Sequence, residues 1–189
     1  MTGKTHQVLG ITIGTSYFLA SKAPTYEPAT FGAVLVFSYL AALLPDIDQP
    51  AGKFWHFLPF GHTLGKVSNP FLEHRNITHS FLGAAIVCTG MILLFRLSPS
   101  YWGIDTHMVT ICALASYLSH IFADMFTNEG VPLFFPWHRF FGLPLKPFEG
   151  FRVATGKWFE NLVIFPVINI VLIVFVISNW SKLHSILFK

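Results

Sequence analysis

Charged residues are scarce in this chain, and their scarcity excludes most soluble proteins. Only 11% of the 189 residues are Asp, Glu, Lys or Arg, whereas 53% are hydrophobic and the mean hydropathy is +0.57. A soluble domain carries about 25% charged residues. We therefore expect an integral membrane protein, and the length favours a single domain over residues 1–189.

Cysteine is also rare. Cys88 and Cys112 both lie inside apolar runs, where we expect them to be buried as small hydrophobic side chains. The sequence lacks internal repeats, low-complexity segments and any basic cluster interleaved with aromatic residues. Although the net charge is +3, nucleic acid is therefore not an expected partner.

Five apolar stretches predict the fold class. They cover approximately residues 7–21, 29–44, 80–97, 107–126 and 161–178. Because a membrane-spanning helix needs about 20 residues, several stretches need their flanking residues to cross. We predict an all-α, multi-pass transmembrane protein of about five helices, in which residues 7–21 form a retained helix and not a signal peptide.

Lysine and arginine are divided unevenly between the two ends of these helices. With five spans, eight of the 12 basic residues lie on the side of the amino terminus and four on the other side. Since basic loops resist translocation, the first side is predicted to face the cytoplasm. The interiors of the first, second, third and fifth stretches contain no charged residue, whereas an ion pathway needs polar groups through the full membrane thickness.

Eight residues able to bind metal or transfer protons gather where the apolar stretches meet the segments of that same side. They are His6, Asp46, Asp48, His74, His79, His120, Asp124 and Glu160. Ionisable groups at membrane depth are costly and usually mark a function. Their distribution predicts a metal-dependent site at one membrane face.

The spacing of the carboxylates supports this prediction. His120 and Asp124 are four residues apart and share a helix face, although a helical His–Asp hydrogen bond would give the same pattern. Asp46 and Asp48 follow Pro45 at the end of the second helix, where the helix dipole disfavours negative charge by about 0.3–1 kcal/mol. A cation would compensate these acids, and the alternative is a turn capped by its own aspartates.

The segment before the third helix contributes two histidines and an arginine. Thr78 is the expected helix cap, which places His79 in the first turn and His74 in the preceding loop. One of these histidines can bind metal while the other donates a proton. Arg75 can bind an anionic substrate, because guanidinium grips phosphate with two hydrogen bonds, and the alternative is a purely topological positive charge.

Glu160 and the aromatic loops can each be explained without a functional role. Glu160 begins the last helix, where an acid is stabilised by the dipole alone. The loops over residues 53–60 and 132–148 are rich in aromatic side chains. These side chains either pack the loops onto the helix ends or form an interfacial platform that admits a lipid.

Four segments carry a family resemblance: LLPDIDQP (43–50), HRNITHS (74–80), YLSHIFADMFTNEGVPLFFP (117–136) and GKWFE (156–160). With them the chain resembles the YdjM-like family of LexA-regulated, membrane-bound, metal-dependent hydrolases of the bacterial inner membrane. More distantly, it is similar to the zinc-dependent phospholipase C and P1 nuclease group, all-helical enzymes that cut phosphoesters with clustered metals.

The resemblance implies metal-ligand roles for His79, His120 and Asp124, completed by His6, Asp46 and Asp48. It also aligns Gly156-x-x-x-Glu160 with the His-x-x-x-Glu of the secreted enzymes. The missing imidazole at Gly156 is a departure from that pattern and favours two ions over three.

We therefore expect a membrane-bound hydrolase that cleaves a phosphoester in a lipid or membrane-adjacent substrate through metal-activated water. The expected cofactor is two divalent ions, with zinc favoured over manganese or iron. The expected ligands are His6, Asp46, Asp48, His79, His120, Asp124 and Glu160, with His74 and Asp48 catalytic and Arg75 binding substrate. The side chains of Asp46, His79, His120 and Asp124 should meet at one point.

Two other interpretations stay open. The first is a non-catalytic metal-binding or metal-transport membrane protein. The second is an interaction module in which the histidines and aspartates only lock the helices together.

Overall fold

The computed structural model describes residues 1–21, 27–48, 77–97, 103–137 and 139–188, and these confirm the all-α fold class. Six α-helices lie in the described residues: α1 (Gly3–Ala20), α2 (Pro28–Ala41), α4 (Phe81–Leu97), α5 (Thr106–Met125), α6 (Phe165–Ser178) and α7 (Trp180–Leu187). Three short 3-10 turns are η1 (Leu44–Asp48), η3 (Ile77–His79) and η4 (Phe148–Phe151), and a π-helical turn, η5 (Glu160–Ile164), leads into α6.

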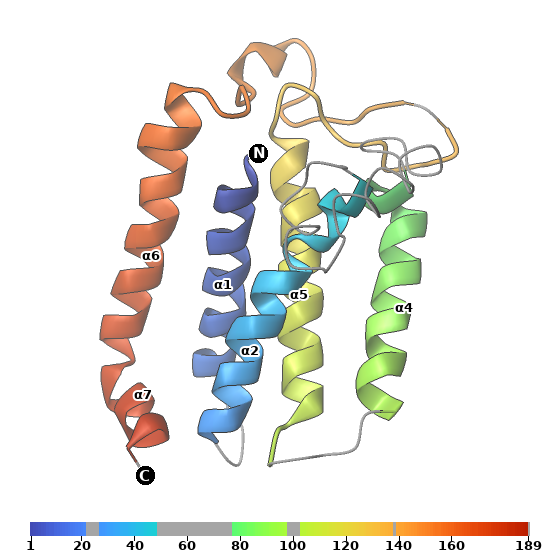
Figure 1. Ribbon diagram of the computed structural model, residues 1–189. Helices are drawn as coiled ribbons and strands as arrows, with labels where there is room; N and C mark the ends of the chain where they lie inside the picture. The colour runs from blue at the N-terminus through green and yellow to red at the C-terminus, as the bar shows by residue number, and fades with distance from the viewer. Residues whose placement is uncertain (22–26, 49–76, 98–102, 138, 189) are drawn as a thin grey trace, which may run out of the picture.

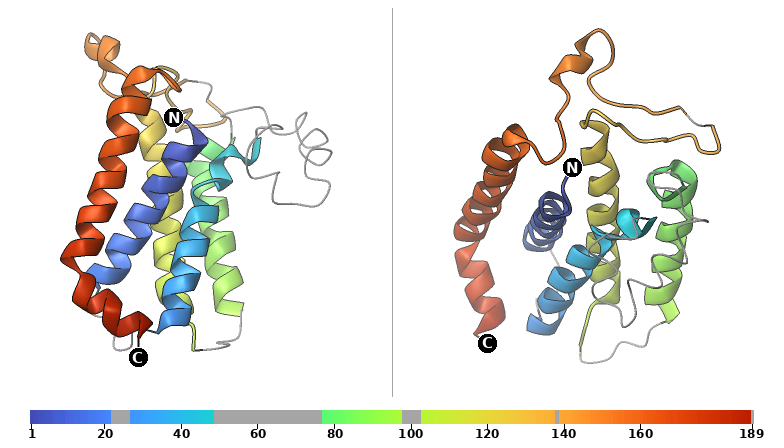
Figure 2. Two further views of the ribbon diagram at one scale, coloured as in Figure 1. Left: turned by 60° about the vertical axis from the view of Figure 1, so that its left-hand side comes forward. Right: turned by 45° about the horizontal axis from the view of Figure 1, so that its top comes forward.

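The five long helices run side by side and alternate in direction (Figure 1). They coincide with the five predicted apolar stretches. Helix α5 lies at the centre and packs against α1, α2 and α4, while α6 packs against α1 on the outside (Figure 2). The amino end of α1, the carboxyl end of α5 and both η1 and η3 therefore meet at one end of the bundle, which we call the site end.

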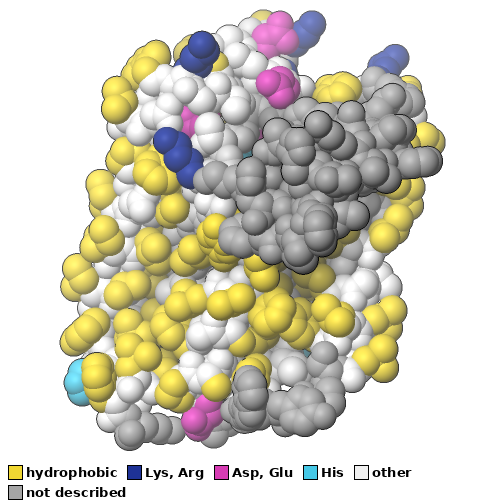
Figure 3. Space-filling view, in the orientation of Figure 1, with side chains coloured by type: hydrophobic (Ala, Val, Ile, Leu, Met, Phe, Trp, Pro, Cys, Tyr) yellow, Lys and Arg dark blue, Asp and Glu magenta, His cyan; other side chains and the backbone are white. Residues whose placement is uncertain are grey.

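The helix surfaces are those of a membrane protein. Residues Thr106–Met125 and Glu160–Ser178 are each long and apolar enough to cross a bilayer, and α2 and α4 are shorter apolar helices. Helix α6 buries none of its residues against the rest of the chain. Hydrophobic side chains cover the middle of the face seen in Figure 3, and lysine and arginine gather at its site end. A helix that is apolar all round and uncovered by the rest of its chain is typical of a membrane-spanning segment.

Small residues let α1 approach both α2 and α5 closely. A Cβ on Gly14 would lie 2.0 Å from Ser38 Oγ of α2, and one on Gly10 would lie 2.5 Å from Ala42 Cβ. Close packing of this kind holds membrane helices together, because lipid removes the hydrophobic drive between them.

The contacts between α1 and α5 keep a regular register of one helical turn. Cys112 Sγ lies 3.5 Å from the Gly14 carbonyl oxygen, and the Ser116 hydroxyl donates to the Gly10 carbonyl at 2.9 Å. One turn further toward the site end, the same stripes present His6 and His120 to each other. Helix packing thus determines which histidines meet.

The segment between α5 and α6 folds over the site end. Val131 and Phe141 exchange two backbone hydrogen bonds, and the Val153 backbone pairs with the end of α5. Val131 is buried at its base, whereas Trp137 and Trp158 are exposed. Its base therefore packs onto the helix ends while other aromatic rings point outward; the predicted aromatic loop over 53–60 lies outside the described residues.

The Gly14 contact generates a stability prediction. Gly14→Ala should lower the free energy of unfolding by about 1–3 kcal/mol, because the added methyl group overlaps Ser38 across the α1–α2 contact. Thermal unfolding in detergent measures this change. The matched control is Gly32→Ala in α2, where the added methyl group meets no atom within 4 Å and should be neutral or slightly stabilising. Equal unfolding temperatures for both variants would contradict the packing role of Gly14.

Candidate metal centre

Five of the predicted ligands meet at the site end from four separate elements. His6 comes from α1, His120 and Asp124 from α5, Asp46 from η1 and His79 from η3. His6, His79, His120 and Asp124 are fully buried, and the Asp46 side chain is 14% exposed. The predicted convergence is therefore present, and it combines three imidazoles with two carboxylates.

His120 is held in one orientation by the end of α2. Its Nδ1 lies 2.7 Å from the Ala42 carbonyl oxygen, which only accepts, so Nδ1 carries the proton. In the neutral ring, Nε2 is then left with its lone pair. Nε2 is 3.7 Å from Asp46 Oδ1 and 3.7 Å from Asp124 Oδ2, and it has no hydrogen-bond partner among the described residues. Three electron-rich atoms thus face one point, which is the environment of a cation.

His79 completes a ring of four donors around that point. Its Nε2 is 3.6 Å from Asp124 Oδ2 and 4.0 Å from Asp46 Oδ1. Tetrahedral ligands that each lie about 2.0–2.2 Å from a zinc ion are separated by about 3.3–3.6 Å. The observed separations of 3.6–4.0 Å are slightly longer and need only a small contraction. The donor types and these four separations are therefore compatible with a bound divalent ion.

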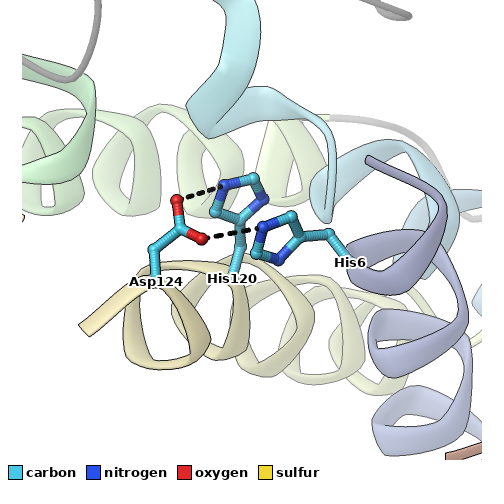
Figure 4. Close-up of side chains that lie close together, drawn as sticks. All are labelled: His6, His120 and Asp124. Carbon is cyan, nitrogen blue, oxygen red and sulfur yellow. Dashed lines mark ion pairs between the residues drawn. The ribbon is translucent and has the colours of Figure 1, made fainter. Parts of the chain in front are cut away.

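The second oxygen of Asp124 faces α1 (Figure 4). Asp124 Oδ1 is 3.0 Å from His6 Nε2 and also contacts the Met1 ammonium group. The His6 ring stacks on the His120 ring, with the centroids 3.5 Å apart and the planes 8° from parallel. Two overlapping groups able to hold an ion result, His6–His120–Asp124 and Asp46–His79–His120. Asp124 directs Oδ1 toward His6 and Oδ2 toward His79 and His120. The two groups share His120, whose Nε2 can bind only one ion because Nδ1 is bonded to the Ala42 carbonyl.

The turn that carries His79 is fixed by neighbours that the sequence did not indicate. Thr78 Oγ1 lies 3.1 Å from His79 Nδ1, and the Tyr117 hydroxyl donates to the Thr78 carbonyl at 2.8 Å. The prediction that Thr78 caps the third helix is wrong. Helix α4 begins at Phe81, and Ser80 Oγ accepts the Gly83 N–H at 3.0 Å. The helix starts later because η3 takes up residues 77–79, so His79 precedes the helix.

Glu160, predicted as a ligand, has a different environment. Neither metal-capable group among the described residues includes it. Glu160 Oε1 accepts from the Thr2 N–H at 2.6 Å and from the hydroxyls of Thr2 and Thr5, and Oε2 accepts from the Gly156 N–H at 2.7 Å. The carboxylate thus ties the start of α6 to the first turn of α1, just ahead of His6. The glycine that departs from the family pattern supplies a backbone donor.

Three predicted site residues cannot be placed at the cluster. Asp48 lies in η1, two residues after Asp46, but its side chain is not described. His74 and Arg75 lie outside the described residues. The carbonyl of Ala42, which orients His120, was missed because a backbone group has no sequence signature. Tyr117 had a weak signal, since it lies three residues before His120 on the same helix.

Comparison with known proteins gives consistent results. The family model described as YdjM inner membrane protein matches residues 1–185. Over 149 residues the chain is 33% identical to "Inner membrane protein YdjM" of Escherichia coli (strain K12), covering 77% of this chain and 70% of that protein. Over 164 residues it is 29% identical to "Uncharacterized protein YvsG" of Bacillus subtilis (strain 168), covering 87% and 88%. No solved structure matches the chain.

A substitution of Glu160 can distinguish a role in anchoring α6 to α1 from a role as a metal ligand. Glu160→Ala should destabilise the protein by about 1–3 kcal/mol, because the buried Thr5 hydroxyl and the part-buried N–H groups of Thr2 and Gly156 lose their acceptor. Thermal unfolding in detergent and elemental analysis of the purified protein are the two measurements. Glu149→Ala, in the exposed segment between α5 and α6, is the control and should change neither. A variant of Glu160 that keeps its stability but loses metal would restore the ligand assignment.

Proposed function

The chain belongs to the YdjM inner membrane protein family, and on that premise we propose that it is a membrane-bound, metal-dependent hydrolase. Its proposed substrate is a phosphoester in a lipid or a membrane-adjacent molecule. The observation that carries this proposal is the ring of buried donors around His120 Nε2. Buried carboxylates and lone pairs that face one another are costly without a cation.

The composition of the ring supports particular ions. Imidazole and carboxylate together suit zinc, manganese or iron better than calcium or magnesium. We propose two ions, because the two oxygens of Asp124 point to different sides of the cluster. Such ions polarise a phosphoryl oxygen and lower the pKa of water, so that a phosphoester can be hydrolysed near neutral pH.

The chain's own groups have separable roles in this proposal. The Ala42 carbonyl keeps the Nε2 lone pair of His120 directed at the cluster. Asp124 supplies negative charge to both sides, and His6 Nε2 lies 3.0 Å from Asp124 Oδ1, where it can donate a proton to the carboxylate or bind an ion beside it. Asp46 is the most exposed of the five donors and marks the side from which substrate reaches the site. We propose His74 and Asp48 as catalytic residues and Arg75 as the phosphate-binding residue.

The choice of a phosphoester rests on chemistry and on resemblance. The motifs resemble, at a distance, the zinc-dependent phospholipase C and P1 nuclease group, and clustered divalent ions suit phosphoester cleavage. The site lies at one end of lipid-facing helices and beneath an aromatic segment, which favours a lipid. The proposed regulation by LexA rests on the family resemblance alone. The basic residues at the site end favour the cytoplasmic face.

Asp124→Asn tests the proposal directly. Removal of one negative charge should reduce the metal content and slow hydrolysis of a phospholipid panel by about a hundredfold or more. The helices should still insert, because membrane helices satisfy their backbone hydrogen bonds internally. The matched control is Asp105→Asn at the other end of α5, where the side chain caps the helix and asparagine caps equally well.

The outcomes distinguish the alternatives. Metal without turnover in the parent protein would favour a metal-binding or metal-transport protein. Neither metal nor turnover, together with a more stable Asp124→Asn variant, would favour an interaction module. Turnover and metal content that are unchanged in Asp124→Asn would remove Asp124 from the ligand set.

Sidedness can be measured with cysteine substitutions. In Lys146→Cys, at the site end, the thiol should react with an impermeant reagent only after the cells are opened, because this side is proposed to be cytoplasmic. In His184→Cys, on α7 at the opposite end, it should react in intact cells. The parent protein, with Cys88 and Cys112 in apolar helices, gives the background. The reverse pattern would place the site on the outer face.

A further inference from the structure

An apolar groove runs between α4 and α5 at the site end. Its volume is about 290 Å³, near the lower end of the range for small-molecule sites. It is lined by Phe81 and Ala84 of α4, by Leu118, Ile121, Phe122 and Met125 of α5, and also by Ser80 and Leu133. None of these described lining residues is charged.

The groove lies beside the metal centre at the same level of the bundle. On α5, Ile121 and Met125 each directly follow a cluster residue, His120 and Asp124. Consecutive helix positions differ by about 100°, so the groove occupies the face next to the one that carries the cluster. At its other wall, Ser80 directly follows His79. The groove and the cluster thus share helix α5 and the junction between η3 and α4.

The groove opens toward the lipid. Phe81 and Phe122 line it and are 58% and 59% exposed, on helices whose outward surfaces are apolar. The Phe81 N–H donates to the Leu133 carbonyl at 2.9 Å, and the Phe81 and Phe134 rings meet edge to face at 5.4 Å. The segment after α5 therefore closes the groove at the site end. Its opening faces the hydrocarbon of the leaflet that borders the site.

Among the described lining residues, no side chain offers a free polar group to a headgroup. The Ser80 hydroxyl already donates to the Ile77 carbonyl at 2.7 Å and accepts the Gly83 N–H. An apolar groove of this volume that opens to hydrocarbon suits a flexible apolar chain.

We propose that this groove holds an acyl chain of a membrane phospholipid whose phosphoester reaches the adjacent metal centre. The inference rests on the proposed function and narrows its substrate to a lipid with a long chain. The groove contributes by shape, since a lipid tail gains little hydrophobic free energy on leaving the bilayer. It holds the phosphoester of the substrate at the depth of the cluster. Such positioning of the reacting groups speeds the reaction.

Photocrosslinking tests the groove without any need for turnover. The protein is reconstituted in nanodiscs containing phosphatidylglycerol with a diazirine near the end of one acyl chain. Labelling is expected within residues 81–84 and 118–125, and Ala84→Phe should reduce it there about fivefold or more by filling the groove. Labelling of α6, which faces lipid along its length, should stay unchanged and serves as the internal reference.

Ala85→Phe is the matched control, because Ala85 is the next residue of α4, is exposed and does not line the groove. It should leave labelling of the groove at the parent level. Equal labelling of the groove in the parent and in Ala84→Phe would overturn the proposal. Labelling confined to Met91–Phe95, which lines a smaller apolar groove between α2 and α4, would also overturn it.

Hydrolysis separates failure of this inference from failure of the proposed function. For any headgroup that the parent protein hydrolyses, Ala84→Phe should lower kcat/KM about tenfold for the dioleoyl lipid and leave the dibutyryl lipid unchanged. Ala85→Phe should change neither value. An equal loss for both lipids would place the defect in the metal centre and overturn the groove assignment. Absence of turnover in the parent would refute the hydrolase, while the crosslinking result still decides whether an acyl chain occupies the groove.

Discussion

The close contact between α1 and α5 is the constraint on which the rest of the structure depends. Gly14 meets Cys112, Gly10 meets Ser116, and the next turn brings His6 against His120. In lipid the two helices associate by shape and hydrogen bonding, so a bulkier residue in this stripe would separate them. The same spacing that packs the helices in the membrane interior stacks the two imidazoles at its edge. The contact between α1 and α5 therefore both packs the two helices and brings the two imidazoles of the site together.

The polar cluster is costly in such a protein, and its environment limits that cost. His6, His79, His120 and Asp124 are all buried at one end of the bundle. Each contacts a fixed neighbour: the Ala42 carbonyl for His120, the Thr78 hydroxyl for His79, and one another for His6 and Asp124. Glu160 links the start of α6 to α1 by accepting hydrogen bonds from Thr2 and Thr5. The remaining negative charge faces the point where a cation would offset it.

Much of this arrangement follows from local sequence pattern, and the parts that do not are long-range. Apolar run length gave the five helices, and the four-residue spacing placed His120 and Asp124 on one face. The start of α4 was misplaced at Thr78, because Thr78 and Ser80 are both favourable caps by local propensity and the η3 turn decides between them. The partners of Glu160 and of His120 come from segments 155 and 78 residues away in the chain, which no local pattern encodes.

The five donors divide into two mechanical classes. His6, His120 and Asp124 sit on long helices that are packed in register, so their geometry exists before any ion arrives. Asp46 and His79 sit on single 3-10 turns, whose positions depend on contacts with neighbouring elements, such as the bond from the Tyr117 hydroxyl to the Thr78 carbonyl. An ion entering this centre would therefore meet the helical donors in a fixed arrangement, and would depend on the two turns to complete its set of ligands.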